Sequence, residues 1–318
     1  MSEAFAQQLA LLPAYLGAHL TISLVGLVAG VLLSLPLAVF IAKYDRLRWP
    51  VLAVVGAIQT IPSLALLALM VPLLNSFGFA PTVAALTLYS MLPVLRNTVT
   101  GITGVDAGVV EAARGMGMTE RQLLWRIELP LAAPVILAGI RTAAVWVVGI
   151  ATLSTPIGQT SLGNYIFAGL QTRRWDVVLL GCAAATALAL LVDGIIALAE
   201  RGMQPGRRAL VGAAAVCLIL LGLLGAIAPR SGVDWFVPAD DTTAGAKSVA
   251  KRDEESTVRL EVVRVGAKSF TEQYILAALV ADELSASGYR IESVDSLGST
   301  VAFEALRRDE IQVYVDYT

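Results

Sequence analysis

The sequence is poor in the residues on which most enzyme and metal sites depend. It has one histidine and two cysteines in 318 residues, and only 15% of its residues are charged. Cys182 and Cys217 both lie in apolar stretches, so we interpret them as small packing residues, not as a disulfide or a metal pair. His19 stands at the start of an apolar stretch and is interpreted as an interfacial polar residue, not as a ligand. No catalytic residue and no metal site is predicted.

Two other patterns are absent. No phosphate loop of the type GxxxxGK[ST] occurs, so the chain itself is not expected to bind or hydrolyse ATP. The net charge of -2 provides no basic surface for a nucleic acid. The first residues contain an acidic residue and no basic cluster, unlike a cleaved signal peptide. Nucleotide hydrolysis and nucleic-acid binding are therefore disfavoured as functions.

The chain is rich in apolar residues. Hydrophobic residues make up 57% of it, against about 45–50% in an ordinary soluble domain. Six apolar stretches reach the length of about 20 residues that a helix needs to cross a bilayer, and they lie near residues 19–42, 51–74, 82–102, 131–153, 177–199 and 210–228. The sequence therefore predicts an all-α polytopic membrane domain over residues 1–228. Kinks are expected at Pro36, Pro62 and Pro93.

The basic residues predict an orientation. The connections after the first, third and fifth stretches hold Lys43, Arg46, Arg48, Arg114, Arg121, Arg126, Arg201, Arg207 and Arg208. The alternate connections hold only Arg173 and Arg174. Because cytoplasmic connections are enriched in Lys and Arg, the first set is expected in the cytoplasm. The N-terminus and everything after the sixth stretch are then expected outside.

Three charged residues fall inside the predicted spans: Arg96, Arg141 and Asp193. Charges in lipid are costly and are usually paired or exposed to water. Arg96 and Asp193 lie toward the predicted cytoplasmic ends, where long side chains can reach the interface. Arg141 lies deeper, and we hypothesise that it pairs with Asp193. No role in solute binding is assigned to this pair.

The composition changes near residue 229. Residues 229–257 are rich in Gly, Pro, Asp, Lys and Ser, which is typical of a linker. From residue 258 to 318 a soluble pattern follows, with strands expected at 261–266, 289–294 and 311–317 and helices at 269–287 and 300–308. Alternating strands and helices predict a parallel sheet. Because so few residues make a small core, we expect this domain to be truncated.

The third connection, from Glu111 to Pro130, carries the most specific pattern. Gly115 and Gly117 permit a reversal with positive φ, Thr119 can cap a second helix, and Pro130 can begin the fourth span. A plain amphipathic connector is the alternative interpretation.

The loop resembles the EAA loop of ABC-importer permeases in full spacing, through Glu111, Ala112, Ala113, Gly117, Ile127, Leu129 and Pro130. The resemblance implies the ABC-importer permease fold. It also implies that these residues couple the chain to a separate cytoplasmic ATPase dimer, which carries the ATP and Mg. No cofactor is expected in this chain.

The last sixty residues carry a second resemblance. Gly266–Gln273, Leu297–Thr300 and Val313–Thr318 resemble the first lobe of binding proteins for glycine betaine, choline and related compatible solutes. The permease part resembles the same subfamily. The resemblance implies a partial α/β periplasmic binding-protein lobe fused to the permease. The family more often has Glu at Asp316 and Gly at Ser299.

The chemistry of this lobe fits a quaternary ammonium ligand. Such a cation has no N–H to donate, so aromatic faces must hold it, and Tyr317 is favoured over Tyr314 as a wall. Polar groups that follow the first two strands can hold a carboxylate. The candidate substrate-binding residues are Ser269, Phe270, Gln273, Ser299, Thr300, Tyr314 and Tyr317. Core packing or capping is the alternative for each of them.

Together these patterns indicate a subunit of an ATP-driven importer in the bacterial cytoplasmic (inner) membrane. The expected cargo is glycine betaine, choline, carnitine or a similar solute, and the expected assembly is two permease copies above two ATPases. The chain itself is expected not to be an enzyme. Three alternatives remain open: the same machinery importing ergothioneine, an osmotic or ligand sensor that does not transport, and an exporter.

Overall fold

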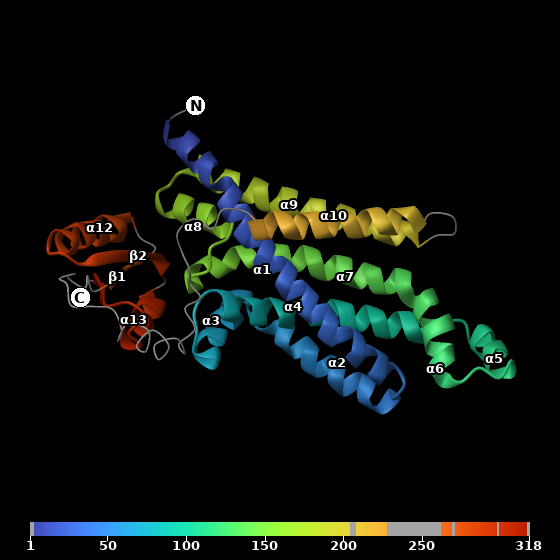
Figure 1. Ribbon diagram of the computed structural model, residues 1–318. Helices are drawn as coiled ribbons and strands as arrows, with labels where there is room; N and C mark the ends of the chain where they lie inside the picture. Colours follow the sequence, from blue (N-terminus) through green and yellow to red (C-terminus); the bar gives the residue numbers. More distant parts are fainter. Residues whose placement is uncertain (1–2, 204–207, 228–261, 269–270, 298, 317–318) are drawn as a thin grey trace, which may run out of the picture.

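A computed structural model describes the chain except residues 1–2, 204–207, 228–261, 269–270, 298 and 317–318. An elongated bundle of helices carries a small α/β lobe at one end (Figure 1). The long helices of the bundle are α1 (Glu3–Ala42), α2 (Asp45–Thr60), α3 (Ser63–Leu74), α4 (Phe79–Thr103), α7 (Leu129–Ala151), α9 (Trp175–Gly202) and α10 (Arg208–Ile227). The shorter elements are α5 (Ala107–Gly115), α6 (Glu120–Leu123), η1 (Leu124–Glu128), η2 (Thr152–Ile157) and α8 (Gly163–Gln171).

Helix α4 is the centre of the bundle and packs between α1 and α7. Two glycines allow this close approach. A methyl group at Gly26 would lie 2.7 Å from the Cβ of Leu86, and one at Gly139 would lie 2.6 Å from the Cβ of Asn97. Small residues let membrane helices pack closely, which replaces the hydrophobic driving force that lipid does not supply.

The stretch predicted at 51–74 as one span with a kink at Pro62 is broken at that proline. The chain forms two helices there, α2 and α3, which meet at an angle of 100°. Pro62 has no N–H to continue the helix, and it forces the preceding residue, Ile61, to an extended conformation with φ -68° and ψ 129°. Pro36 and Pro93, by contrast, lie inside α1 and α4 without ending them.

Among the described residues, four helical segments are long and apolar enough to cross a membrane: Gln8–Ala42, Phe79–Thr103, Glu120–Ile157 and Trp175–Gly202. The bent pair of α2 and α3 is a fifth candidate span. The sixth predicted stretch forms α10, in which Ala209–Leu223 is a shorter apolar helix. The all-α polytopic domain is confirmed.

The lobe contains a parallel sheet in the order β2-β1-β3, formed by β1 (Val262–Lys268), β2 (Arg290–Leu297) and β3 (Val313–Tyr314). Helix α12 (Thr271–Ala286) packs Ala277 against Val265 and Ala267. Helix α13 (Ser299–Arg307) packs Ala302 and Ala305 with Val294. The predicted α/β order is confirmed, although the third strand is shorter than expected.

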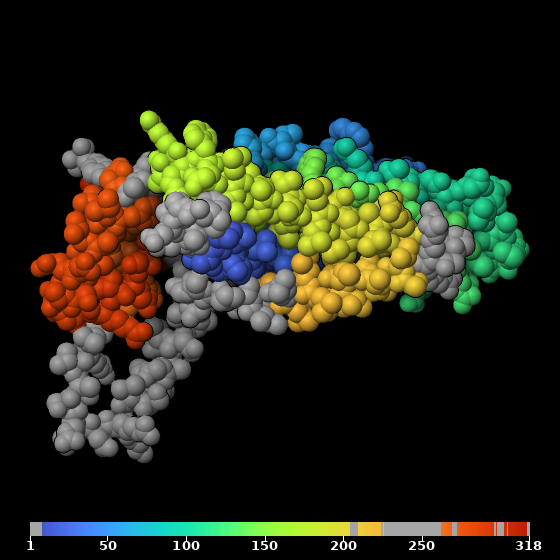
Figure 2. Space-filling model, turned by 90° about the horizontal axis from the view of Figure 1, so that it is seen from above, coloured from blue at the N-terminus to red at the C-terminus, as the bar shows by residue number. Residues whose placement is uncertain are grey.

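The lobe rests on one end of the bundle, against α3 and η2 (Figure 1). Val294 and Leu297 belong to the same buried cluster as Leu67, Phe77 and Ile157. Helices α5 and α6 lie at the opposite end, as both views show (Figures 1 and 2). The two segments singled out from the sequence are therefore separated by the length of the bundle.

Candidate coupling and solute-binding sites

The predicted coupling loop folds as two short helices joined by a turn. Asp106 caps α5 by accepting a hydrogen bond from the Val109 backbone N–H at 3.2 Å. The turn depends on Gly117, which has a φ of +82°, a conformation that favours glycine. Gly115 was expected to share this role, but it remains inside α5. One glycine is enough to reverse the chain.

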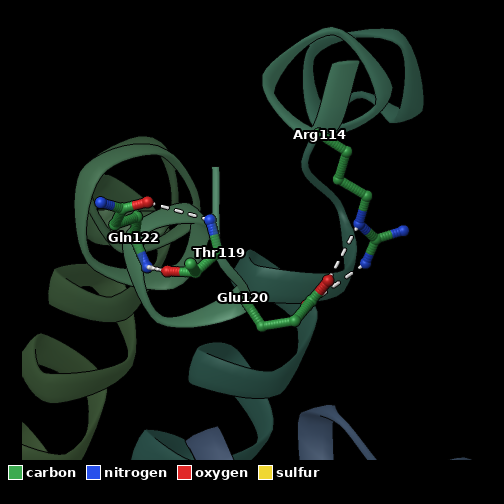
Figure 3. A network of polar contacts seen from close by, with 4 residues as sticks. All are labelled: Arg114, Thr119, Glu120 and Gln122. Atoms are coloured by element: carbon green, nitrogen blue, oxygen red, sulfur yellow. Dashed lines mark hydrogen bonds and ion pairs between the residues drawn. The ribbon is translucent and has the colours of Figure 1, made fainter. Parts of the chain in front are cut away.

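Polar contacts hold the second helix at its start (Figure 3). The Thr119 N–H donates to Gln122 Oε1 at 2.9 Å, and the Gln122 N–H donates to Thr119 Oγ1 at 3.3 Å, which completes a capping box. Arg114 Nε donates to Glu120 Oε1 at 3.1 Å and thereby links α5 to α6. The cap at Thr119 is confirmed. The ion pair was missed because it crosses a turn, where no helical periodicity applies.

The coupling helix continues directly into a membrane span. Helix α6, the π-helical turn η1, α7 and the 3-10 turn η2 form one segment, Glu120–Ile157. Pro130 cannot donate a backbone hydrogen bond to the residue four positions earlier. The helix has a wider, π-helical turn just before Pro130, where the Leu129 N–H donates to the carbonyl of Leu124, five residues earlier. Pro130 does lie in the first turn of α7, as expected, but it does not separate that helix from η1.

The predicted coupling residues divide between surface and interior. Glu111, Ala112, Gly117 and Pro130 are exposed, Ile127 and Leu129 are half-buried, and Ala113 is buried. Large apolar side chains are also exposed here: Met116 is 72% exposed, and Trp125 is 64% exposed. An exposed apolar surface of this kind is typical of a contact with another protein.

The hypothesised ion pair inside the bundle is confirmed. Arg141 on α7 binds Asp193 on α9 through both carboxylate oxygens, with 2.8 Å between Nη2 and Oδ2. Glu200, one heptad after Asp193 on the same helix, lies 3.6 Å from Arg141 Nη1. Glu200 was not predicted to join the pair, although the spacing of seven residues places it on the same face of α9 as Asp193.

His19 is not interfacial, so that interpretation was wrong. Its side chain is completely buried. Nε2 lies 3.0 Å from the Val148 carbonyl, and Nδ1 accepts a hydrogen bond from the Leu162 N–H at 3.3 Å. Because Nδ1 accepts, the proton lies on Nε2. The ring therefore joins α1 to α7 and to the start of α8.

The candidate solute residues are described only in part. Ser269, Phe270 and Tyr317 lie outside the described residues. Ser299 and Thr300 form the first turn of α13. Gln273 is 1% exposed, and neither atom of its amide has a hydrogen-bond partner among the residues that the structure describes. A buried polar group without a partner costs stability, and the role of Gln273 in solute binding stays a prediction.

Tyr314 contacts two charged side chains. Its hydroxyl donates to Asp316 Oδ2 at 3.0 Å, and the Lys268 ammonium, which also pairs with Asp316, lies 5.2 Å from the ring centroid. Burial and this hydrogen bond raise the pKa of the Tyr314 hydroxyl. One face of the ring thus already holds a cation. The role of Tyr317 as a wall stays a prediction, because that residue lies outside the described residues.

Comparison with known proteins supports both resemblances. Residues 26–205 match the family described as binding-protein-dependent transport system inner membrane component. Residues 261–318 match the substrate binding domain of ABC-type glycine betaine transport system. The choline transport system permease protein of Bacillus subtilis (strain 168) is 44% identical over 187 residues, which cover 59% of this chain and 86% of that protein.

Two further comparisons agree with these matches. The carnitine transport permease protein OpuCB of Listeria monocytogenes is 41% identical over 187 residues, which cover 59% of this chain and 85% of that protein. A solved inward-facing structure of the MetNI methionine ABC transporter has a TM-score of 0.54 at 20% identity, and it covers 70% of this chain and 99% of that chain. This structural likeness shows the fold. The chain therefore belongs to the family of inner-membrane components of binding-protein-dependent transport systems.

Proposed function

We propose that the chain is the transmembrane subunit of an ATP-driven importer for quaternary-ammonium compatible solutes. Residues 1–228 form the permease, 229–257 the linker and 258–318 part of the solute-binding domain. The observation that carries the proposal is the placement of the coupling helices and the lobe at opposite ends of one helical bundle. An importer needs this arrangement because its energy source and its cargo are on opposite sides of the membrane.

The distribution of charge supports the orientation. Lys43 lies in the connection between α1 and α2, Arg46 lies in the first turn of α2, and the α5–α6 segment contains Arg114 and Arg121. In Figure 1 both connections lie at the end away from the lobe. By the positive-inside rule this end faces the cytoplasm, so the lobe and the N-terminus face outward.

The continuity of α6, η1 and α7 supplies a coupling route. A separate cytoplasmic ATPase dimer, carrying ATP and Mg, binds the exposed surface of α5 and α6. Its closure moves α7 directly, because no flexible loop intervenes between α6 and α7. Two copies of the chain form the pathway, and alternating access follows from their movement. The chain itself performs no hydrolysis.

The solute class follows from the lobe and the relatives. The related permeases of Bacillus subtilis and Listeria monocytogenes are named for choline and carnitine transport. Both solutes carry a trimethylammonium group, which aromatic rings hold through cation–π attraction. Glycine betaine, choline and carnitine are therefore the expected cargo.

The test is uptake by proteoliposomes that contain the whole protein and its ATPase. With ATP inside, labelled glycine betaine, choline, carnitine and ergothioneine are supplied outside in turn. We expect accumulation of at least one of the first three. Accumulation of ergothioneine alone would identify ergothioneine as the cargo in place of the three expected solutes. ATPase stimulation without accumulation of any solute would contradict transport and identify a sensor. Vesicles with a hydrolysis-deficient ATPase provide the control.

A further inference from the structure

One face of α4 is exposed and polar in the half of the helix nearest the coupling end. Arg96, Thr100 and Thr103 are exposed there. Their spacing of four and three residues places them on one side of the helix. Arg96 lies seven residues before the end of α4, which is about 10 Å along the axis.

The neighbouring helices define where this face opens. On one side, Val99 packs in a cluster with Val51 and Leu52 of α2. On the other side, a methyl group at Gly101 would lie 3.2 Å from the Cβ of Val135 on α7. The polar face therefore lies between α2 and α7. We call the set Arg96, Thr100 and Thr103 the α4 polar face.

Exposed surfaces of α1 and α9 are apolar in their middle parts. Leu32 and Leu33 on α1 are 66% and 56% exposed, and Leu179 and Leu190 on α9 are 68% and 67% exposed. Apolar surfaces of this kind are compatible with contact to the lipid chains of a membrane. A charged residue facing lipid is costly, so membrane proteins direct such residues toward water or toward partners. The α4 polar face is therefore assigned to a watery environment.

Arg96 also differs from Arg141, which is the other arginine of the membrane-spanning segments discussed above. Arg141 is paired with Asp193 and Glu200. Arg96 forms no hydrogen bond or ion pair with the residues that the structure describes. Its guanidinium is thus available to an external anion, and its fork geometry matches a carboxylate.

We propose that the α4 polar face lines the solute pathway, and that Arg96 makes the pathway selective for solutes that carry a carboxylate. This inference rests on the proposed function. A zwitterion such as glycine betaine presents its carboxylate to Arg96. Choline carries only a positive charge, and Arg96 repels it. Arg96 is then a specificity-determining residue beyond the binding lobe.

The experiment compares initial rates of ATP-driven uptake of glycine betaine and choline in proteoliposomes. The variants are Arg96→Gln, Arg96→Lys and the control Arg46→Gln, which removes an exposed arginine in the first turn of α2. For Arg96→Gln we expect the ratio of betaine to choline uptake to fall about tenfold, the size of one charged contact. Arg96→Lys keeps the charge and should retain most of the ratio. Arg46→Gln should leave it unchanged.

Solute binding by the whole protein in detergent is measured for the same variants. Unchanged binding, together with the altered uptake ratio, locates the selectivity in the pathway. If Arg96→Gln slows both solutes equally, or leaves both rates unchanged, the inference is wrong. If the wild-type protein transports glycine betaine, choline and carnitine no better than the vesicles with the hydrolysis-deficient ATPase, the proposed function fails.

Thiol labelling tests the α4 polar face independently of transport. Arg96→Cys and Leu33→Cys are placed in a background with Cys182→Ala and Cys217→Ala, and each is treated with a water-soluble maleimide. Leu33 is the matched control because it lies nine residues before the end of α1, on an apolar surface. We expect labelling at position 96 and little at position 33. Absence of labelling at position 96 would overturn the assignment.

Discussion

The two ends of the bundle are held in different ways. At the coupling end, the stabilising contacts are local: Asp106 caps its own helix, and Arg114 meets Glu120 six residues away. At the lobe end, they join distant parts of the chain. A methyl group at Gly158 would lie 3.8 Å from Leu297, and Arg308 lies 5.6 Å from the Phe77 ring centroid. The coupling end thus keeps its apolar surface exposed for another protein, whereas the lobe end buries apolar surface within the chain.

The largest expected effect is at the coupling end. Gly117→Pro replaces a residue with φ +82° by one restricted to about -65°. The turn between α5 and α6 cannot then form, and we expect uptake to fall by more than about tenfold. Solute binding by the lobe should be unaffected. ATP hydrolysis and uptake are measured together, and Gly117→Asn, which tolerates positive φ, is the matched control. Loss of solute binding in Gly117→Pro would show that the two ends are not independent.

A second change tests the lobe end. Leu297 is 1% exposed, so Leu297→Ala should destabilise the lobe by about 2–4 kcal/mol through lost burial and a cavity. Thermal unfolding and limited proteolysis of the whole protein measure the effect. The control, Leu279→Ala, removes a leucine that is 59% exposed on α12. If Leu297→Ala is no more destabilising than Leu279→Ala, the packing of the lobe end contributes little.

The ion pair between the two ends gives a third test. Asp193→Ala leaves Arg141 without its nearest partner and should cost about 1–3 kcal/mol, less than for a fully buried pair because both side chains are partly exposed. Arg141→Ala/Asp193→Ala should recover part of this loss. Thermal stability in detergent of the two single variants and the double variant forms the cycle. Simple additivity would rule out direct coupling between these residues.

The smallest expected effect concerns the helix cap at the coupling end. Thr119→Ala removes the acceptor of the Gln122 N–H and should destabilise α6 by about 1 kcal/mol. Thr119→Ser keeps the hydroxyl and serves as the control. Hydrogen exchange at the backbone of α6 is the measurement. An effect that spreads to the lobe would contradict the view that coupling-end contacts are local.

The candidate sites were predictable to different degrees. The cap at Thr119 and the turn at Gly117 depend on residues a few positions apart, so the sequence predicts them well. A kink was expected at Pro62 but a complete break was not, because a proline in a membrane helix produces either a kink or a break, depending on its neighbours. The role of His19 was also missed. Its partners, Val148 and Leu162, are far away in the sequence.

By itself, the sequence determined the apolar helices, the coupling turn and the order of strands and helices in the lobe. These follow from composition, periodicity and local capping, which act over a few residues. From the basic residues the sequence also predicted that the lobe and the coupling loop lie on opposite sides, and it suggested the pair of Arg141 and Asp193. Only the tertiary structure decided that Glu200 joins this pair, that Arg96 has no ion pair among the described residues, and that His19 is buried. Those properties depend on which helix faces meet, and helix packing joins residues that are distant in the chain.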